Sequence, residues 1–185
     1  MTTRPAMPLP ALEAPQVLVE NPPVLMRPAA GADAEAVRAF YFRGREAEFR
    51  PLGLPPAMLS VLLDGQFRAQ QAGYGAQFPD LQTLLMIREG AMIGRLMLAR
   101  DAGGAGAASL RVVDIAIDKS CRGRGLGERA LTLVAEAARA AGFSALTLEV
   151  QIDNAVARRL YARLGFVTGN LDPAGISVAM RKPLG

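Results

Sequence analysis

A strand, a glycine-rich loop, a helix and a second strand follow one another between residues 110 and 150. Residues 110–118 are apolar and strand-like, and the loop at 122–127 reads R-G-R-G-L-G. An alanine-rich helical pattern at about 127–141 leads to a second strand-like run at 145–150. Two strands joined by one crossing helix lie parallel in the same sheet, with a right-handed connection. This order of elements therefore predicts a sheet with at least one parallel pair of strands.

The segments around this unit predict further elements in the order β-α-α-β-β-β-α-β-α-β-β. Strands are expected at 24–27, 81–88, 91–99, 110–118, 145–150, from 166 onward and at 176–180, and helices at about 34–47, 57–72, 127–141 and 154–164. The three strands between 81 and 118 follow one another through turn signals and predict an antiparallel meander. We therefore predict one α/β (α+β) domain with a mixed central sheet of about seven strands and about four helices.

The N-terminal residues differ in composition from the rest of the chain. Residues 1–23 are rich in proline and lack hydrophobic periodicity, which predicts a disordered arm before a domain at 24–185. The prolines also interrupt any apolar stretch that could serve as a signal peptide. No apolar run reaches the ~18 residues that a membrane span needs. We therefore expect a cytoplasmic protein with no membrane partner.

The absence of histidine and the single cysteine, Cys121, limit the chemistry. They exclude imidazole acid–base catalysis, Ser-His-Asp triads, histidine metal ligands, intramolecular disulfides and cysteine metal clusters. Carboxylates, Tyr, Ser/Thr, Cys or bound water must therefore move protons, and no metal is expected. The net charge of +4 suits a polyanionic ligand, but no basic patch is interleaved with aromatic residues, so no nucleic-acid partner is expected.

The glycine loop at 122–127 predicts an anion site. Glycine allows positive φ and close approach to the backbone, and the start of the next helix adds free N–H groups. A nucleoside-triphosphate loop of the Walker type is excluded because no Lys and no Ser/Thr follow the glycines. A dinucleotide site is disfavoured because Glu128 stands where the third glycine is required.

Arg122, Gly125 and Gly127 fill the pattern R-x-x-G-x-G, which resembles the acetyl-CoA pyrophosphate motif of the GNAT family of N-acetyltransferases. Other segments that resemble the family follow in the same order: I-A-I-D at 115–118, L-E-V at 148–150, Asn154, and L-Y-A-R-L-G-F at 160–166. The resemblance extends over about residues 24–181 and implies the fold and activity of that family.

The resemblance also implies the residues that bind acetyl-CoA. In the family, the strand before the loop separates from its parallel neighbour, and its backbone binds the pantetheine arm. The backbone of the glycine loop holds the pyrophosphate, and nearby arginines can add positive charge. Asn154 contacts the CoA arm or only caps its helix. The implied residues are Ile115, Ala116, Ile117, Arg122, Gly123, Arg124, Gly125, Leu126, Gly127, Glu128 and Asn154.

Tyr161 and Glu149 are the catalytic residues that the resemblance implies. Tyr161 would protonate the leaving thiolate, which suits a phenol with a pKa of about 10. Glu149 matches the proposed base of bacterial ribosomal-protein N-acetyltransferases, and strand alternation places it away from the side chains of its apolar neighbours. Asp114 is the rival base, and either carboxylate could act through water. Cys121 is interpreted as a loop residue because the family transfers the acetyl group without a covalent intermediate.

The sequence therefore predicts an acetyl-CoA-dependent N-acetyltransferase, a monomer or homodimer, that acetylates a primary amine of a small molecule or peptide by direct attack. The acceptor is expected near residues 41–56. The segment at 168–177 lacks the aromatic residues that ribosomal-protein transferases use to hold a peptide, which weakens a peptide acceptor. The alternative is a non-catalytic acyl-CoA-binding regulatory module on the same fold, which would keep the loop without the acid–base pair.

Overall fold

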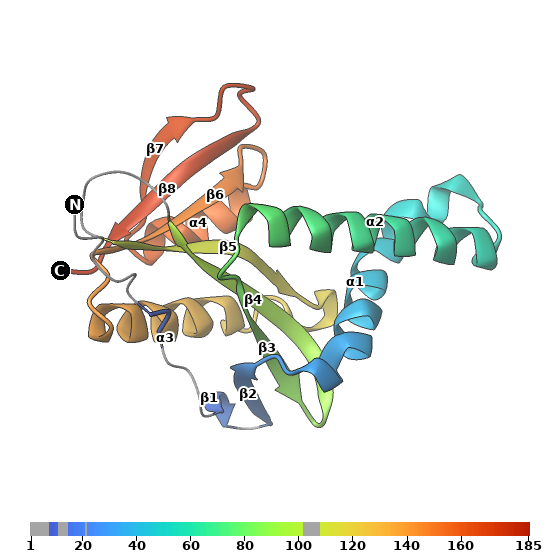
Figure 1. Cartoon of the computed structure of the whole chain (residues 1–185), viewed down its shortest axis with the longest axis horizontal. Helices are drawn as coiled ribbons and strands as arrows, with labels where there is room; N and C mark the ends of the chain where they lie inside the picture. Colours follow the sequence, from blue (N-terminus) through green and yellow to red (C-terminus); the bar gives the residue numbers. More distant parts are fainter. Residues whose placement is uncertain (1–7, 11–14, 21, 102–107) are drawn as a thin grey trace.

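A computed structural model describes residues 8–10, 15–20, 22–101 and 108–185, and within them eight strands form one sheet in the order β1-β2-β3-β4-β5-β6-β8-β7 (Figure 1). The strands are β1 Gln16–Glu20, β2 Pro23–Pro28, β3 Gln82–Arg88, β4 Ala91–Asp101, β5 Ser109–Ile117, β6 Ala145–Gln151, β7 Val167–Leu171 and β8 Ser177–Pro183. The helices are α1 Ala34–Phe49, α2 Pro56–Gln77, α3 Leu126–Ala140 and α4 Ala155–Arg163, with short 3-10 turns η1 Gly31–Asp33, η2 Arg50–Leu52 and η3 Lys119–Cys121.

The structure confirms the mixed α/β sheet. Strands β3, β4 and β5 form the expected antiparallel meander, and β5 and β6 are the expected parallel pair. Helix α2 extends beyond the predicted end at residue 72 and includes Gly73 and Gly75. Glycine only weakens a helix, and tertiary packing can override that preference. Most of the turn predicted at 101–108 lies outside the described residues.

Strand β1 corrects the prediction of a disordered arm at residues 1–23. It pairs antiparallel with β2 and forms one edge of the sheet, and Leu18 packs into the core. β1 itself contains no proline, and Pro23 is the first residue of β2, a position where a strand tolerates proline. Residues 1–7, 11–14 and 21 of the expected arm lie outside the described residues. The domain start at residue 24 stays a prediction.

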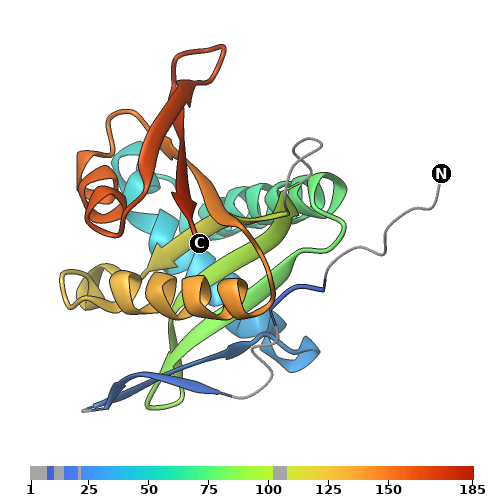
Figure 2. The same cartoon turned by 90° about the vertical axis from the view of Figure 1, so that its left-hand side faces the viewer.

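Helices cover both faces of the sheet (Figures 1 and 2). Helix α3 packs on β1, β5 and β6 through a stripe of small and aliphatic residues, and α4 adds the aromatic ring of Tyr161 to the same core. Helix α1 packs on the opposite face, where Phe40 contacts Leu85 and Met92. The second face carries less apolar contact, which leaves room for polar side chains between the sheet and α1.

Leu84→Ala tests the core between the sheet and α3. Leu84 is fully buried in β3, and its truncation is expected to lower the free energy of unfolding by about 2–5 kcal/mol because it leaves a cavity. Val61→Ala in α2, at a side chain that is 71% exposed, should change it by no more than about 0.5 kcal/mol. Urea unfolding measures both, and equal losses would contradict this placement of the core.

Candidate functional site

Strands β5 and β6 separate halfway along β5. Their parallel register ends at the pair Val112 and Leu148, while β5 continues along β4 as far as Ile117. At the point of separation the β4–β5 register shifts, and Val113 is the extra residue. Such a bulge bends its strand and disrupts pairing locally. The structure therefore opens the sheet where the family resemblance implies an opening.

A cavity of about 190 Å³, here called the slit, lies between the separated strands. It brings together five of the residues singled out in the sequence, Asp114 and Ile115 from β5, Glu149 from β6, Asn154 from the turn before α4 and Tyr161 from α4. Its lining is Val112, Val113, Asp114, Ile115, Leu148, Glu149, Val150, Gln151, Asn154 and Tyr161. A hydroxyl, two carboxylates and two side-chain amides thus belong to residues that line one cavity.

Tyr161 lies on α4 with its ring packed against Phe166, at 5.7 Å between ring centroids. Burial raises the pKa of its phenol above the usual value, and the negative charge of Asp114 raises it further. Both effects disfavour the phenolate. The phenol is therefore protonated at neutral pH and can donate a proton.

Glu149 projects from β6 on the face opposite its buried neighbours Leu148 and Val150, as the alternation predicts. Its side chain is 49% exposed, and its Oε1 lies 2.9 Å from the guanidinium of Arg111 on β5. The pair joins the two strands just before they separate. A solvated carboxylate at the slit can exchange protons with water.

Asn154 ends the turn between β6 and α4, and its Oδ1 accepts a hydrogen bond from the N–H of Ala157 at 3.1 Å. The structure therefore shows the helix cap that the sequence allowed. Asn154 also lines the slit, in addition to this role.

The glycine loop connects η3 to α3. Gly123 and Gly125 have φ of 73° and 75°, a conformation that other residues rarely adopt. Residues 122–125 are exposed, and α3 begins directly after Gly125 with a buried Leu126. A Cβ on Gly127 would lie 3.4 Å from Ile117, so this position sets the helix start close to the end of β5. The loop therefore presents backbone and the α3 N-terminus to solvent, which suits an anion.

Two charged side chains at the loop, Arg122 and Glu128, have partners outside the slit. The Nε of Arg122 donates to the carbonyl oxygen of Ile117 at 2.8 Å, and Glu128 lies 3.8 Å from Arg163 of α4. Arg124 is exposed. Arg122, Ala116 and Ile117 line a second cavity instead, on the side of the sheet that α1 covers.

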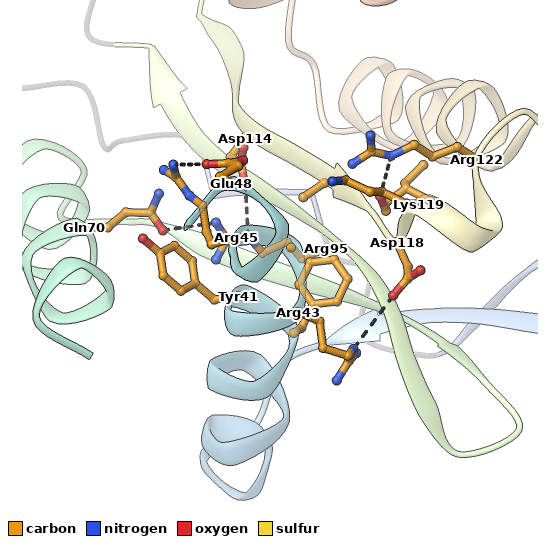
Figure 3. Close-up of a pocket in the computed structure, with 14 residues that line it drawn as sticks. Tyr41, Arg43, Arg45, Glu48, Gln70, Arg95, Asp114, Asp118, Lys119 and Arg122 are labelled. Carbon is orange, nitrogen blue, oxygen red and sulfur yellow. Dashed lines mark hydrogen bonds and ion pairs between the residues drawn. The ribbon is translucent and has the colours of Figure 1, made fainter. Parts of the chain in front are cut away.

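This second cavity, here called the α1 cavity, has a volume of about 260 Å³. Figure 3 shows side chains from α1 and α2 that face β4, β5 and the start of the loop. Its lining is Phe40, Tyr41, Arg43, Gly44, Arg45, Glu48, Gln70, Arg95, Asp114, Ala116, Ile117, Asp118, Lys119 and Arg122. Five residues of the segment 41–56, where the acceptor is expected, line this cavity, and residues 49–56 do not. The place of the acceptor stays a prediction.

Arg95 and Gln70 are residues of this cavity that the sequence prediction missed. Arg95 is 5% exposed, and its Nε donates to Asp114 Oδ2 at 2.9 Å. Its Nη2 lies 3.3 Å from the amide oxygen of Gln70 on α2. A single charge inside the apolar run M-I-G-R-L-M-L was the signal that could have identified Arg95. Asp114 lines both cavities and therefore marks their junction.

Asp118 marks the other end of the α1 cavity. Its carboxylate accepts hydrogen bonds from the N–H and the hydroxyl of Ser120, which together hold its pKa below the usual value.

Across the described ranges no group of three or more His, Cys, Asp or Glu residues could hold a metal ion. No helix among the same residues is long and apolar enough to cross a membrane.

Comparison with known proteins gives consistent matches. The model of the acetyltransferase (GNAT) family matches residues 54–166. The IAA acetyltransferase of Azospirillum brasilense is 35% identical over 136 residues, which are 71% of this chain and 81% of that protein. A GNAT-family acetyltransferase from Streptococcus pneumoniae has 27% identity and a TM-score of 0.60, over 88% of this chain and 99% of that one.

The PaiA N-acetyltransferase from Thermoplasma acidophilum, solved in complex with coenzyme A, has the same fold. Its TM-score is 0.65 at 14% identity, over 86% of this chain and 98% of that one. The family match covers both separated strands, the glycine loop and Tyr161. The resemblance seen in the sequence is thus confirmed: the chain is an N-acetyltransferase of the acetyltransferase (GNAT) family.

Proposed function

We propose that this enzyme transfers the acetyl group of acetyl-CoA to a primary amine of a small molecule or peptide by direct attack. The observation that carries the proposal is the slit, which joins a buried phenol and a solvated carboxylate where the sheet opens beside the glycine loop. The segment at 168–177 lacks the aromatic residues with which ribosomal-protein transferases hold a peptide, and this favours a small-molecule acceptor over a peptide.

In this proposal acetyl-CoA binds along the open edge of β5. The backbone of Ile115, Ala116 and Ile117 holds the pantetheine arm, with the amide of Asn154 beside it. The N–H groups of residues 122–128 and the N-terminus of α3 hold the pyrophosphate. The exposed, positive-φ glycines fit this role because they leave the backbone accessible. The solved complex of the Thermoplasma enzyme with coenzyme A supports the same ligand here.

The proposed chemistry removes two protons from the acceptor ammonium, one before and one after the attack, and supplies one proton to the leaving sulfur. Glu149, through water, takes a proton from the acceptor ammonium, and the free amine attacks the thioester carbonyl. The new N–C bond forms, the C–S bond breaks, and the nitrogen loses its second proton to water as it becomes the amide nitrogen. Tyr161 protonates the departing thiolate. The raised pKa of Tyr161 supports its part, because the phenol stays protonated until the thiolate forms. General acids and bases of this kind each contribute about 100-fold or more.

Gly125→Val tests the pyrophosphate loop. A β-branched residue at a φ of 75° is strained by about 1–2 kcal/mol, so the loop should shift and CoA affinity should fall roughly tenfold. Gly75→Ala is the matched control, because Gly75 lies inside α2 with open space around it. Isothermal titration with CoA measures both variants. Wild-type affinity in Gly125→Val would remove the loop from the binding site.

The experiment that tests the proposed function is an acetyl-CoA consumption assay over amino acids, polyamines, aminoglycosides and peptides. The proposal predicts amine-dependent thiol release and an N-acetylated product with at least one small amine. Tight CoA binding without turnover on any of these amines would contradict it and would favour the non-catalytic acyl-CoA-binding module.

A further inference from the structure

Asp114 stands at the junction of the slit and the α1 cavity, and among the acidic residues that the structure describes it alone lines both. Glu149 and Tyr161 line the slit only, and Glu48 and Asp118 line the α1 cavity only. An acceptor that enters from the α1 side must therefore pass Asp114 to reach the thioester that the proposed function places in the slit.

The carboxylate of Asp114 is held by one oxygen and open at the other. Oδ2 accepts the hydrogen bond from Arg95, while Oδ1 has no hydrogen-bond partner among the described residues. The side chain is 27% exposed, so Oδ1 can reach a ligand in the cavities. A carboxylate with one oxygen fixed and one open is oriented to accept a hydrogen bond from a cation.

Arg95 fixes this orientation from a buried position between the sheet and α2. Its guanidinium donates to Asp114 from one side and to Gln70 from the other, as Figure 3 shows. Its Nη1 is buried and has no partner among the residues that the structure describes, so burial of this guanidinium is only partly compensated. A buried ion pair is often no more stabilising than apolar residues of the same size, and this one is therefore a candidate for a functional role.

Resting on the proposed function, we propose that Asp114 binds the ammonium group of the acceptor at this junction, with Arg95 and Gln70 as positioning residues that orient its carboxylate. The acceptor body then occupies the α1 cavity, and its nitrogen points into the slit. Glu149 keeps the task of removing the proton through water. The charge of Asp114 already acts on the phenol of Tyr161, which agrees with a short path between the bound amine and the acid.

Asp114→Asn separates this role from that of a base. Loss of a charged hydrogen bond should raise the KM for the fastest panel amine about tenfold or more, with kcat at saturating amine and the KM for acetyl-CoA nearly unchanged. Asp80→Asn is the matched control, because Asp80 pairs with Arg100 outside both cavities. A fall in kcat with an unchanged amine KM would assign Asp114 to proton removal instead and overturn the proposal.

A second variant removes the risk that an unpaired buried Arg95 unfolds the protein. Arg95→Met/Asp114→Leu deletes both charges with apolar groups, which is often neutral for stability. It should show the same rise in amine KM. Gln70→Ala should raise the amine KM by a smaller factor at unchanged CoA affinity. A wild-type amine KM in the double variant would refute the proposal.

Binding of n-butylammonium to the CoA-loaded protein tests the same site without turnover. Saturation-transfer NMR should show contact of n-butylammonium with the wild-type protein and with Asp80→Asn, and none with Asp114→Asn. The neutral analogue n-butanol should give a weak signal that Asp114→Asn leaves unchanged. Equal n-butylammonium signals in wild type and Asp114→Asn would overturn the assignment, even if no amine of the panel were acetylated and the proposed function itself failed.

Discussion

Tyr161→Phe is expected to lower kcat about 100-fold or more while the affinity for CoA stays at the wild-type value. The ring is buried against Phe166, and the substitution removes only the hydroxyl, so packing is preserved. Without the phenol, the thiolate must leave unprotonated or take its proton from water. Steady-state kinetics with the fastest amine and titration with CoA measure the two quantities.

Tyr74→Phe is the matched control for this variant. Tyr74 lies on α2 and lines neither cavity, so loss of its hydroxyl should leave kcat unchanged. A phenol can act as an acid only at a pH below its own pKa, and the pKa of Tyr161 is raised. At any pH below about 10, deprotonation of Tyr161 should therefore not lower kcat. An unchanged kcat in Tyr161→Phe would remove Tyr161 from the chemistry.

Glu149→Gln is expected to lower kcat about 100-fold near neutral pH, because the glutamine keeps the shape but cannot take the proton of the ammonium. The difference in kcat between wild type and Glu149→Gln should decrease as the pH rises. An alkyl amine with a pKa of about 10.4 is then deprotonated in solution and needs no base. Activity profiles of both proteins against pH measure this convergence, with the same acetylated product identified throughout.

Glu136→Gln on α3 is the control for that experiment, because Glu136 is exposed and lines neither cavity. Thermal unfolding of Glu149→Gln checks that Arg111, which loses its ion-pair partner, does not destabilise the fold. Parallel profiles with a constant difference between wild type and Glu149→Gln would assign Glu149 a structural role.

Short sequence patterns predicted the elements whose contacts are made between residues close together in the sequence. The apolar run of β5, the glycines and the periodic stripe of α3 follow one another directly, so the parallel crossover could be inferred from the sequence alone. The cap at Asn154 was equally local, since its partner is the N–H of Ala157. Strand β1 was missed because prolines surround it and its stability comes from pairing with β2.

The junction of the two cavities depends on contacts that no local pattern contains. Arg95 and Asp114 are 19 residues apart in sequence and meet across neighbouring strands, and Gln70 reaches them from another element. The register shift beside Asp114 also depends on how β4 and β5 pair. The sequence identified Asp114, Glu149 and Tyr161 as separate candidates, and only the fold shows that they share the slit.

The most direct test of the central claim, direct acetyl transfer in the slit, is the stoichiometry of one reaction. Wild-type protein, acetyl-CoA and the fastest panel amine should yield one N-acetylated amine for each CoA thiol released, with no acetylated protein detected by mass spectrometry. The Tyr161→Phe/Glu149→Gln variant should bind CoA as tightly and form almost no product. Thiol release without acetylated amine, an acetyl-protein intermediate, or full product formation by the double variant would contradict it.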